Sequence, residues 1–254
     1  MALQHQLKRC LALVAMAIAP ASASELPVGF IYLREAIAGI PQDIRYAGAH
    51  NFLGRPVDGY LANECILTKQ AANALAKVQA ALVAGDLSLI VWDCYRPARA
   101  VADFKAWSAE ANDQVAKAEF YPRTAKASFF KQGYLASRSG HSRGSTIDLG
   151  IVPLSAAGLA PEAAAGQISC TAQRGERYDD HTIDFGTGYD CLDPISSVAD
   201  PSVSEQARQN RKLLRDLMSG AGFKPYDKEW WHFQLADEPF PSQYFDFPVA
   251  PWSE

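Results

Sequence analysis

The chain has 254 residues, of which 48% are hydrophobic and 20% are charged, and its formal net charge is −4. This composition is typical of a globular protein with a full core, and the length suits one generous domain or two small ones. The small negative charge and the lack of any basic cluster in the sequence exclude an electrostatic basis for binding nucleic acid.

The first 23 residues have the pattern of a secretory signal peptide. Lys8 and Arg9 form a positive region, residues 10–20 form a short apolar run, and Ala21-Ser22-Ala23 is a small-residue cleavage site. A membrane anchor is the alternative, but the run is too short to span a bilayer. We therefore expect cleavage near Ala23, a periplasmic or secreted protein comprising residues 24–254, and no stable membrane insertion.

Export determines how the cysteines are interpreted. After loss of Cys10 the chain keeps an even number of cysteines in an oxidising compartment, namely Cys65, Cys94, Cys170 and Cys191. Three pairings are possible, and we favour Cys65–Cys94 with Cys170–Cys191 because each closes a modest loop. The alternative is a cysteine-rich zinc site, which the absence of any Cys-x-x-Cys motif disfavours.

The first half of the chain begins with a segment rich in turn residues. Residues 25–60 are punctuated by Pro and Gly, so we expect an extended segment with short strands at most. Thr68 can cap a helix that runs at helical apolar spacing to about Ala84, where Gly85 ends it. Residues 87–92 form a short apolar run that predicts a strand.

Helices, strands and loops alternate in the second half. In chain order the patterns predict a helix over 98–117, a loop with a short helix over 118–136, a strand over 146–152, an insertion or lid over about 154–183, a helix over 205–221 and a strand over 230–235. The aromatic, Pro-rich tail is expected to pack over the domain. The sequence contains no repeat and no linker, which favours a single α+β domain with helices packed on a small, largely antiparallel sheet.

One stretch of the predicted site combines a histidine with an aspartate. His141 lies in a Gly- and Ser-rich loop, and Asp148 follows it on the strand 146–152. His232 lies on the strand near the end of the chain. If these strands meet, the three side chains can bind one zinc ion and leave its fourth position open, which is typical of a catalytic site.

Two further residues suit hydrolysis at such a centre. Glu229 lies three residues before His232, a spacing that places side chains on opposite faces of a regular strand. Glu229 must therefore lie on a bend before the strand if it is to act as the base. Arg96, at the end of the strand 87–92, offers a planar, permanent cation for the oxyanion of a tetrahedral intermediate.

Each of these signals is weak when it is taken alone. Most His-x6-Asp and Glu-x-x-His pairs have no catalytic role, and Arg96 can simply pair with a surface carboxylate. Trp230 and Trp231 are expected in the core and at its rim. His50 and His181 have no partner at a useful spacing and are interpreted as surface histidines.

Taken together, the motifs resemble one family. The sequence is similar to the VanX-type zinc D-alanyl-D-alanine dipeptidases, a D-Ala-D-Ala metallopeptidase family, in motifs that lie in family order and span nearly the whole mature chain. These motifs are NFLGRPVDGY (51–60), WDCYRP (92–97), GYLASRSGHSRGSTIDL (133–149), the glycine loop ending at Asp190, NRKLLRDLM and GF (210–223), EWWHF (229–233) and DEPFPSQYFDFP (237–248).

The resemblance implies a role for each matching residue. It implies one zinc ion per chain, held by His141, Asp148 and His232, with Glu229 as the base and Arg96 stabilising the transition state. It further implies that Ser139 lies by the carboxylate of a small dipeptide, and that Asp190 and Tyr46 hold its ammonium group. Such a pocket favours free dipeptides because a longer chain leaves its buried groups unpaired.

Two departures from the family pattern and two alternative functions stay open. Gly140 stands where the family often has a second serine, and the stretch from about 154 to 183 is longer than in compact members. One alternative is a zinc D,D-carboxypeptidase that trims peptidoglycan stems. The other is a zinc-containing wall-binding module without catalysis, which would need neither Glu229 nor Arg96. The oligomeric state and the choice between wall turnover and resistance cannot be read from the sequence.

Overall fold

The computed structural model describes residues 25–161 and 167–253, which form a single mixed α+β domain, and the expected signal peptide lies outside these residues. The main sheet is antiparallel, and its strand order is β3 (Leu87–Asp93), β4 (Thr146–Pro153), β6 (Glu229–Leu235) and β5 (Phe223–Tyr226). A second antiparallel sheet pairs β1 (Phe30–Tyr32) with β2 (Ile66–Thr68). The expected α+β fold class is confirmed, and the predicted strands agree with the observed ones to within one residue.

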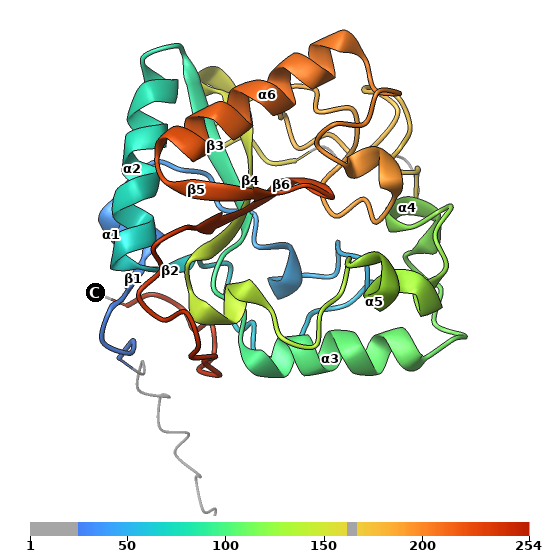
Figure 1. Ribbon diagram of the computed structural model, residues 1–254, viewed down its shortest axis with the longest axis horizontal. Coiled ribbons are helices and arrows are strands. Elements are labelled where there is room, and N and C mark those ends of the chain that lie inside the picture. Colours follow the sequence, from blue (N-terminus) through green and yellow to red (C-terminus); the bar gives the residue numbers. More distant parts are fainter. Residues whose placement is uncertain (1–24, 162–166, 254) are drawn as a thin grey trace, which may run out of the picture.

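Two long helices cover one face of the main sheet. They are α2 (Lys69–Val83), which packs on β3, and α6 (Glu205–Gly220), which packs on β5 and β6 (Figure 1). Both begin at a side-chain cap, since the Thr68 and Ser204 hydroxyls accept from backbone N–H groups three residues on. The cap at Thr68 was predicted, and the cap at Ser204 was not. Leu75 of α2 and Leu214 of α6 are fully buried, whereas Leu213, which the apolar spacing of α6 also includes, is exposed.

The opposite side of the sheet faces α3 (Ala98–Ala109), as Figure 1 shows. This helix was expected to continue to residue 117, and that prediction is wrong. Its backbone becomes non-helical at Glu110, and Lys126 Nζ donates at 2.8 Å to the carbonyls of Glu110 and Asp113. Asn112 and Asp113 have low helix propensity, so a buried lysine that captures two carbonyls is enough to end the helix.

Shorter elements complete the domain. The helices α4 (Lys117–Phe120) and α5 (Phe129–Gln132) fall in or beside the stretch expected to hold a loop with a short helix. The N-terminal segment contains α1 (Leu33–Ala36) besides the expected short strand, together with a 3₁₀ turn, Arg45–Ala47. Further 3₁₀ turns are Lys126–Ser128, Gly140–Arg143, Leu154–Ala156 and Pro194–Ser196.

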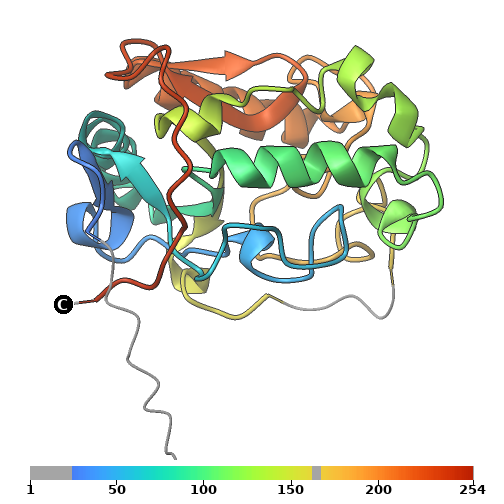
Figure 2. The same ribbon diagram turned by 90° about the horizontal axis from the view of Figure 1, so that it is seen from below.

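The C-terminal segment packs over the domain, as expected. It runs back past α3 toward the N-terminal strand (Figure 2). Phe240 stacks on Phe30 with ring centroids 5.7 Å apart, and Phe247 stacks on Tyr95 at 4.0 Å. Tyr32 donates its hydroxyl to the carbonyl of Ala250 at 3.2 Å. These contacts join the two ends of the described chain.

Both favoured cysteine pairings are confirmed. Cys65 and Cys94 form one disulfide with 5.3 Å between their Cα atoms, and Cys170 and Cys191 form another with 5.5 Å. Within the described residues, no helix has both the length and the apolarity needed to cross a membrane. Of the expected insertion, residues 154–161 and 167–183 are described, and its function as a lid stays a prediction.

Candidate active site

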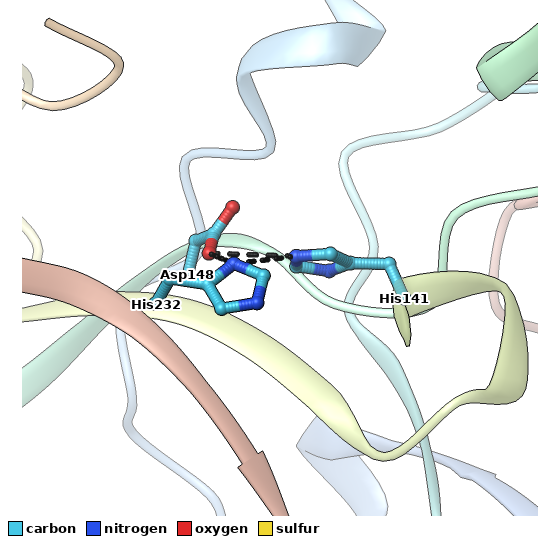
Figure 3. A group of neighbouring side chains, drawn as sticks. All are labelled: His141, Asp148 and His232. Atoms are coloured by element: carbon cyan, nitrogen blue, oxygen red, sulfur yellow. Dashed lines mark hydrogen bonds and ion pairs between the residues drawn. The ribbon is translucent and has the colours of Figure 1, made fainter. Parts of the chain in front are cut away.

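Three potential metal ligands, two from the main sheet and one from a 3₁₀ turn, converge on one point. Each of His141, Asp148 and His232 offers one ligand atom, and the three side chains point toward one another (Figure 3). His232 Nδ1 lies 3.0 Å from Asp148 Oδ1, His141 Nε2 lies 3.4 Å from the same oxygen, and the two nitrogens are 3.3 Å apart. The strands β4 and β6, which the sequence analysis required to meet, are therefore neighbours in the sheet.

The sheet register and one short turn produce this convergence. Asp148 on β4 is the direct cross-strand partner of His232 on β6, so their side chains project from the same face. His141 lies in the 3₁₀ turn Gly140–Arg143, where the Ser139 hydroxyl accepts from its backbone N–H at 3.3 Å. Its Nδ1 donates to the Cys94 carbonyl at 2.7 Å, which leaves Nε2 directed at the other two ligands.

This donor set fits a zinc ion. A tetrahedral ion with ligand distances of about 2.0–2.2 Å holds its ligand atoms about 3.3–3.6 Å apart, close to the separations observed. Within the described chain, the buried Asp148 Oδ1 has no hydrogen-bond partner, so its lone pairs face the centre. Burial raises the pKa of Asp148, but the two histidines outweigh burial and hold the pKa below its ordinary value. Burial lowers the pKa of His232, which favours the neutral imidazole that binds metals.

Glu229 reaches the centre because the strand pairing is irregular. The register between β5 and β6 shifts between Pro225 and Tyr226, so Glu229 departs from the regular alternation of β6. Glu229 Oε2 lies 3.6 Å from His232 Nδ1. Burial first, then the charges of Asp148 and Asp190, raises the pKa of Glu229 well above its ordinary value. Glu229 was expected on a bend before the strand, but it is the first residue of β6, and the irregular pairing takes the place of that bend.

Arg96 is held beside the ligands by a buried aspartate. Its Nη2 lies 2.8 Å from Asp93 Oδ2 and 3.8 Å from Asp148 Oδ2. Tyr60 donates to Asp93 Oδ1 at 2.5 Å, and His141 Nδ1 lies 3.3 Å from Asp93 Oδ2. Because Asp93 is fully buried, the proposed surface partner for Arg96 is excluded. The Arg96 guanidinium also lies 3.5 Å from the Ser139 hydroxyl.

A second buried carboxyl group lies in the same cavity. Asp190 Oδ2 accepts a hydrogen bond from the Tyr46 hydroxyl at 2.8 Å, and both residues are buried. Burial, followed by the charge of Asp148, raises the pKa of Asp190 from 3.8 to about 8. Asp190 has a left-handed backbone with φ of 55°, a conformation that residues other than glycine adopt uncommonly.

All eight residues expected at the site line one cavity of about 290 Å³. These residues are Tyr46, Arg96, Ser139, His141, Asp148, Asp190, Glu229 and His232. Apolar side chains from α3 and the loops complete the wall, including Phe104, Leu135 and Leu192. The cavity thus combines three potential metal ligands, a buried carboxyl group and an apolar lining, which suits a small polar ligand.

Sequence comparisons identify the family of this chain. The profile described as D-ala-D-ala dipeptidase, of the M15 peptidases, matches residues 27–160 and 156–250. The chain belongs to this family. A D-alanyl-D-alanine dipeptidase of Streptomyces coelicolor is 40% identical over 87% of this chain and 98% of its own length. Proteins of the same name from Enterococcus faecium and Enterococcus faecalis are 37% identical over 88% and 87% of this chain, covering 100% and 98% of their lengths.

The structure accounts for one departure from the pattern of the D-ala-D-ala dipeptidase family. Gly140 lies against β4, and a Cβ atom at this position would approach the Thr146 hydroxyl oxygen to 2.6 Å. A serine could be accommodated here only if Thr146 moved. Glycine at position 140 is therefore matched to threonine at position 146, and Ser139 supplies the hydroxyl on this side of the cavity.

Sequence reasoning missed several residues around the site. Asp93 orients both Arg96 and His141. The sequence feature that could have identified it is a charged residue directly after a predicted apolar strand. Tyr189, next to Asp190, donates to Asp148 and gave no separate signal. The side chain of His50 is 34% exposed and pairs with Glu119 at 2.6 Å, so the expectation that this histidine has no partner is wrong.

Proposed function

We propose that this protein is an exported zinc dipeptidase that hydrolyses D-alanyl-D-alanine to two D-alanine molecules. Membership of the D-ala-D-ala dipeptidase family supports the reaction, as do relatives of that name that align over nearly their whole length. The two disulfides support export, because such bonds persist in oxidising compartments. Export favours recovery of dipeptide released from wall turnover over depletion of a cytosolic precursor.

The observation that carries the proposal is the pairing of a metal-binding set with the buried carboxyl group of Asp190 in one small cavity. A free dipeptide is a zwitterion, so its ammonium group can bind Asp190 and Tyr46 while its carboxylate lies near Ser139. An acylated or longer substrate has no ammonium group at this position and would leave the buried Asp190 with its Tyr46 hydrogen bond but without a cation to pair with. That loss typically amounts to several kcal/mol, which excludes such substrates.

The chemistry follows from the side chains around the ligands. Zinc bound by His141, Asp148 and His232 would polarise the scissile carbonyl and lower the pKa of a water molecule to about 7. Glu229 lies within reach of this centre, so it accepts a proton from the attacking water and passes that proton to the leaving amine. Its raised pKa suits a group that both accepts and donates a proton near neutral pH.

Arg96 stabilises the oxyanion that develops during attack. Its guanidinium is already oriented by Asp93 at 2.8 Å, so it needs no reorganisation when charge develops. Such a preorganised donor is typically worth about a hundredfold in rate or more. A wall-binding module would need neither this arginine nor Glu229, whereas a carboxypeptidase would need both and would lack a use for Asp190.

Hydrolysis assays distinguish these functions. The protein lacking residues 1–23 is incubated with zinc and either D-alanyl-D-alanine or its N-acetylated form, and released D-alanine is measured. Cleavage of the free dipeptide alone is the expected result. Cleavage of both substrates would instead indicate a carboxypeptidase, and cleavage of neither by the zinc-loaded protein would favour a binding module.

A further inference from the structure

The two oxygens of Asp148 have different surroundings. Oδ1 faces both histidines, at 3.4 Å from His141 Nε2 and 3.0 Å from His232 Nδ1. Oδ2 points away from them and accepts a hydrogen bond from the Tyr189 hydroxyl at 3.1 Å. One oxygen of the carboxylate therefore faces the other potential metal ligands, and the second oxygen is held by a tyrosine.

Tyr189 is fixed in this position from several sides. Its ring is buried, stacks on Trp92 with centroids 4.6 Å apart, and meets the edge of Trp231 at 5.5 Å. The Arg45 guanidinium lies 5.7 Å from the same ring. With its ring held by aromatic neighbours, the phenol can place its hydroxyl only within a narrow range.

The chain on both sides of Tyr189 is held as well. Gly188 N donates to the carbonyl of Cys170 at 2.9 Å, and Cys170 is bonded to Cys191. Leu192 N donates to the carbonyl of Phe120 at 2.8 Å. The hydroxyl of Tyr189 thus extends from a segment that is fixed to the rest of the domain at both ends.

We infer that Tyr189 is a positioning residue for the metal centre, which holds Asp148 so that Oδ1 alone is presented to the ion. The inference rests on the proposed zinc site. Without the hydroxyl, the Asp148 carboxylate can rotate about its final bond, because among residues 25–161 and 167–253 Oδ2 then keeps only the longer contact of 3.8 Å with Arg96. Partners that orient metal ligands in this way typically change metal affinity about 10- to 100-fold when removed.

The variant Tyr189→Phe tests this role, because it removes the hydroxyl and keeps the ring. The dissociation constant for zinc is measured by competition with a chromogenic chelator, and we expect it to rise about tenfold or more. Tyr95→Phe is the matched control. Tyr95 is equally buried, stacks on Phe247, and donates its hydroxyl to the Phe247 carbonyl at 2.9 Å, away from the centre. Its zinc dissociation constant is expected to stay within about twofold of the wild-type value.

A second measurement separates positioning from a general loss of stability. The cobalt-loaded Tyr189→Phe protein is expected to show a changed visible absorption spectrum, which reports ligand geometry, while the Tyr95→Phe spectrum matches the wild type. Equal zinc dissociation constants and equal cobalt spectra for the wild type and Tyr189→Phe would overturn the inference and leave the proposed zinc site intact. A wild-type protein that binds no zinc would overturn the zinc site and the inference together.

Discussion

Replacing Asp190 by asparagine is expected to stabilise the metal-free protein while it destroys substrate binding. The side chain is buried, and its partner Tyr46 can donate to an amide oxygen as it does to the carboxyl group. A buried carboxyl group whose pKa is raised resists ionisation in the folded state but ionises freely in the unfolded chain. Asparagine carries no such penalty because it never ionises.

The sign and size of this effect follow from the pKa of Asp190. Because the folded pKa is about 8 and the ordinary value is 3.8, wild-type stability falls as pH rises between these values. Each pKa unit corresponds to about 1.4 kcal/mol, so the full difference sets an upper limit of about 6 kcal/mol. Relaxation around the charge reduces such penalties, and we expect a gain of about 2 kcal/mol at pH 8, or a melting temperature about 4–8 °C higher.

The assay is thermal unfolding in EDTA from pH 4 to pH 8, since a bound dication would itself lower the pKa of Asp190. The advantage of Asp190→Asn should be absent near pH 4 and grow toward pH 8. Asp184→Asn is the matched control with the opposite sign. Burial raises the pKa of Asp184, but hydrogen bonds from Gly186 and Arg177 outweigh burial and hold the pKa below its ordinary value. This variant should therefore be less stable than wild type at neutral pH, with the deficit disappearing in acid. A pH-independent difference for Asp190→Asn would refute the reasoning.

Four further outcomes are expected. Glu229→Gln should keep its zinc, measured by elemental analysis, and lose at least about a hundredfold in kcat. His232→Ala should purify without stoichiometric zinc, because one of three ligands is gone. Cys170→Ser/Cys191→Ser should raise KM for the dipeptide several-fold with kcat nearly unchanged, because Cys191 directly follows Asp190. Zinc binding should release protons at pH 7, seen as a calorimetric enthalpy that depends on the buffer, since a dication lowers the raised carboxyl pKa values.

Local sequence patterns correctly predicted those strands in which nearly every residue is buried. The strands β3, β4 and β6 are almost wholly buried, so their apolar residues determined both type and length. The end of α3 could not be predicted in the same way. There the decision depends on Lys126, sixteen residues beyond Glu110, whose ammonium group captures the carbonyls that the helix would otherwise use.

The convergence of the proposed ligands was predictable from the sequence, and the positions of the residues that support them were less so. His141, Asp148 and His232 lie in motifs whose joint occurrence is specific, and Glu229 could be required to lie on a bend. Asp93 could not be assigned a role, because its function depends on the β3–β4 register that places it opposite Asp148. The role of Tyr189 likewise depends on a long-range contact, because its loop must reach Asp148 on β4, and no local spacing in the sequence reveals that contact.

The charge balance of the cavity connects these observations. Asp148, Asp190 and Glu229 are buried in its wall, Asp93 lies behind them, and the partly buried Arg96 is the cation that lies beside Asp148. Burial raises the pKa of Asp93, Asp190 and Glu229, so the metal-free site is a destabilising arrangement. A dication near Asp148 and a substrate ammonium near Asp190 each relieve part of this excess negative charge. In the proposed enzyme, the same carboxyl groups that destabilise the metal-free fold would provide the affinity for both the metal ion and the substrate, which is why removing Asp190 should improve stability and abolish function together.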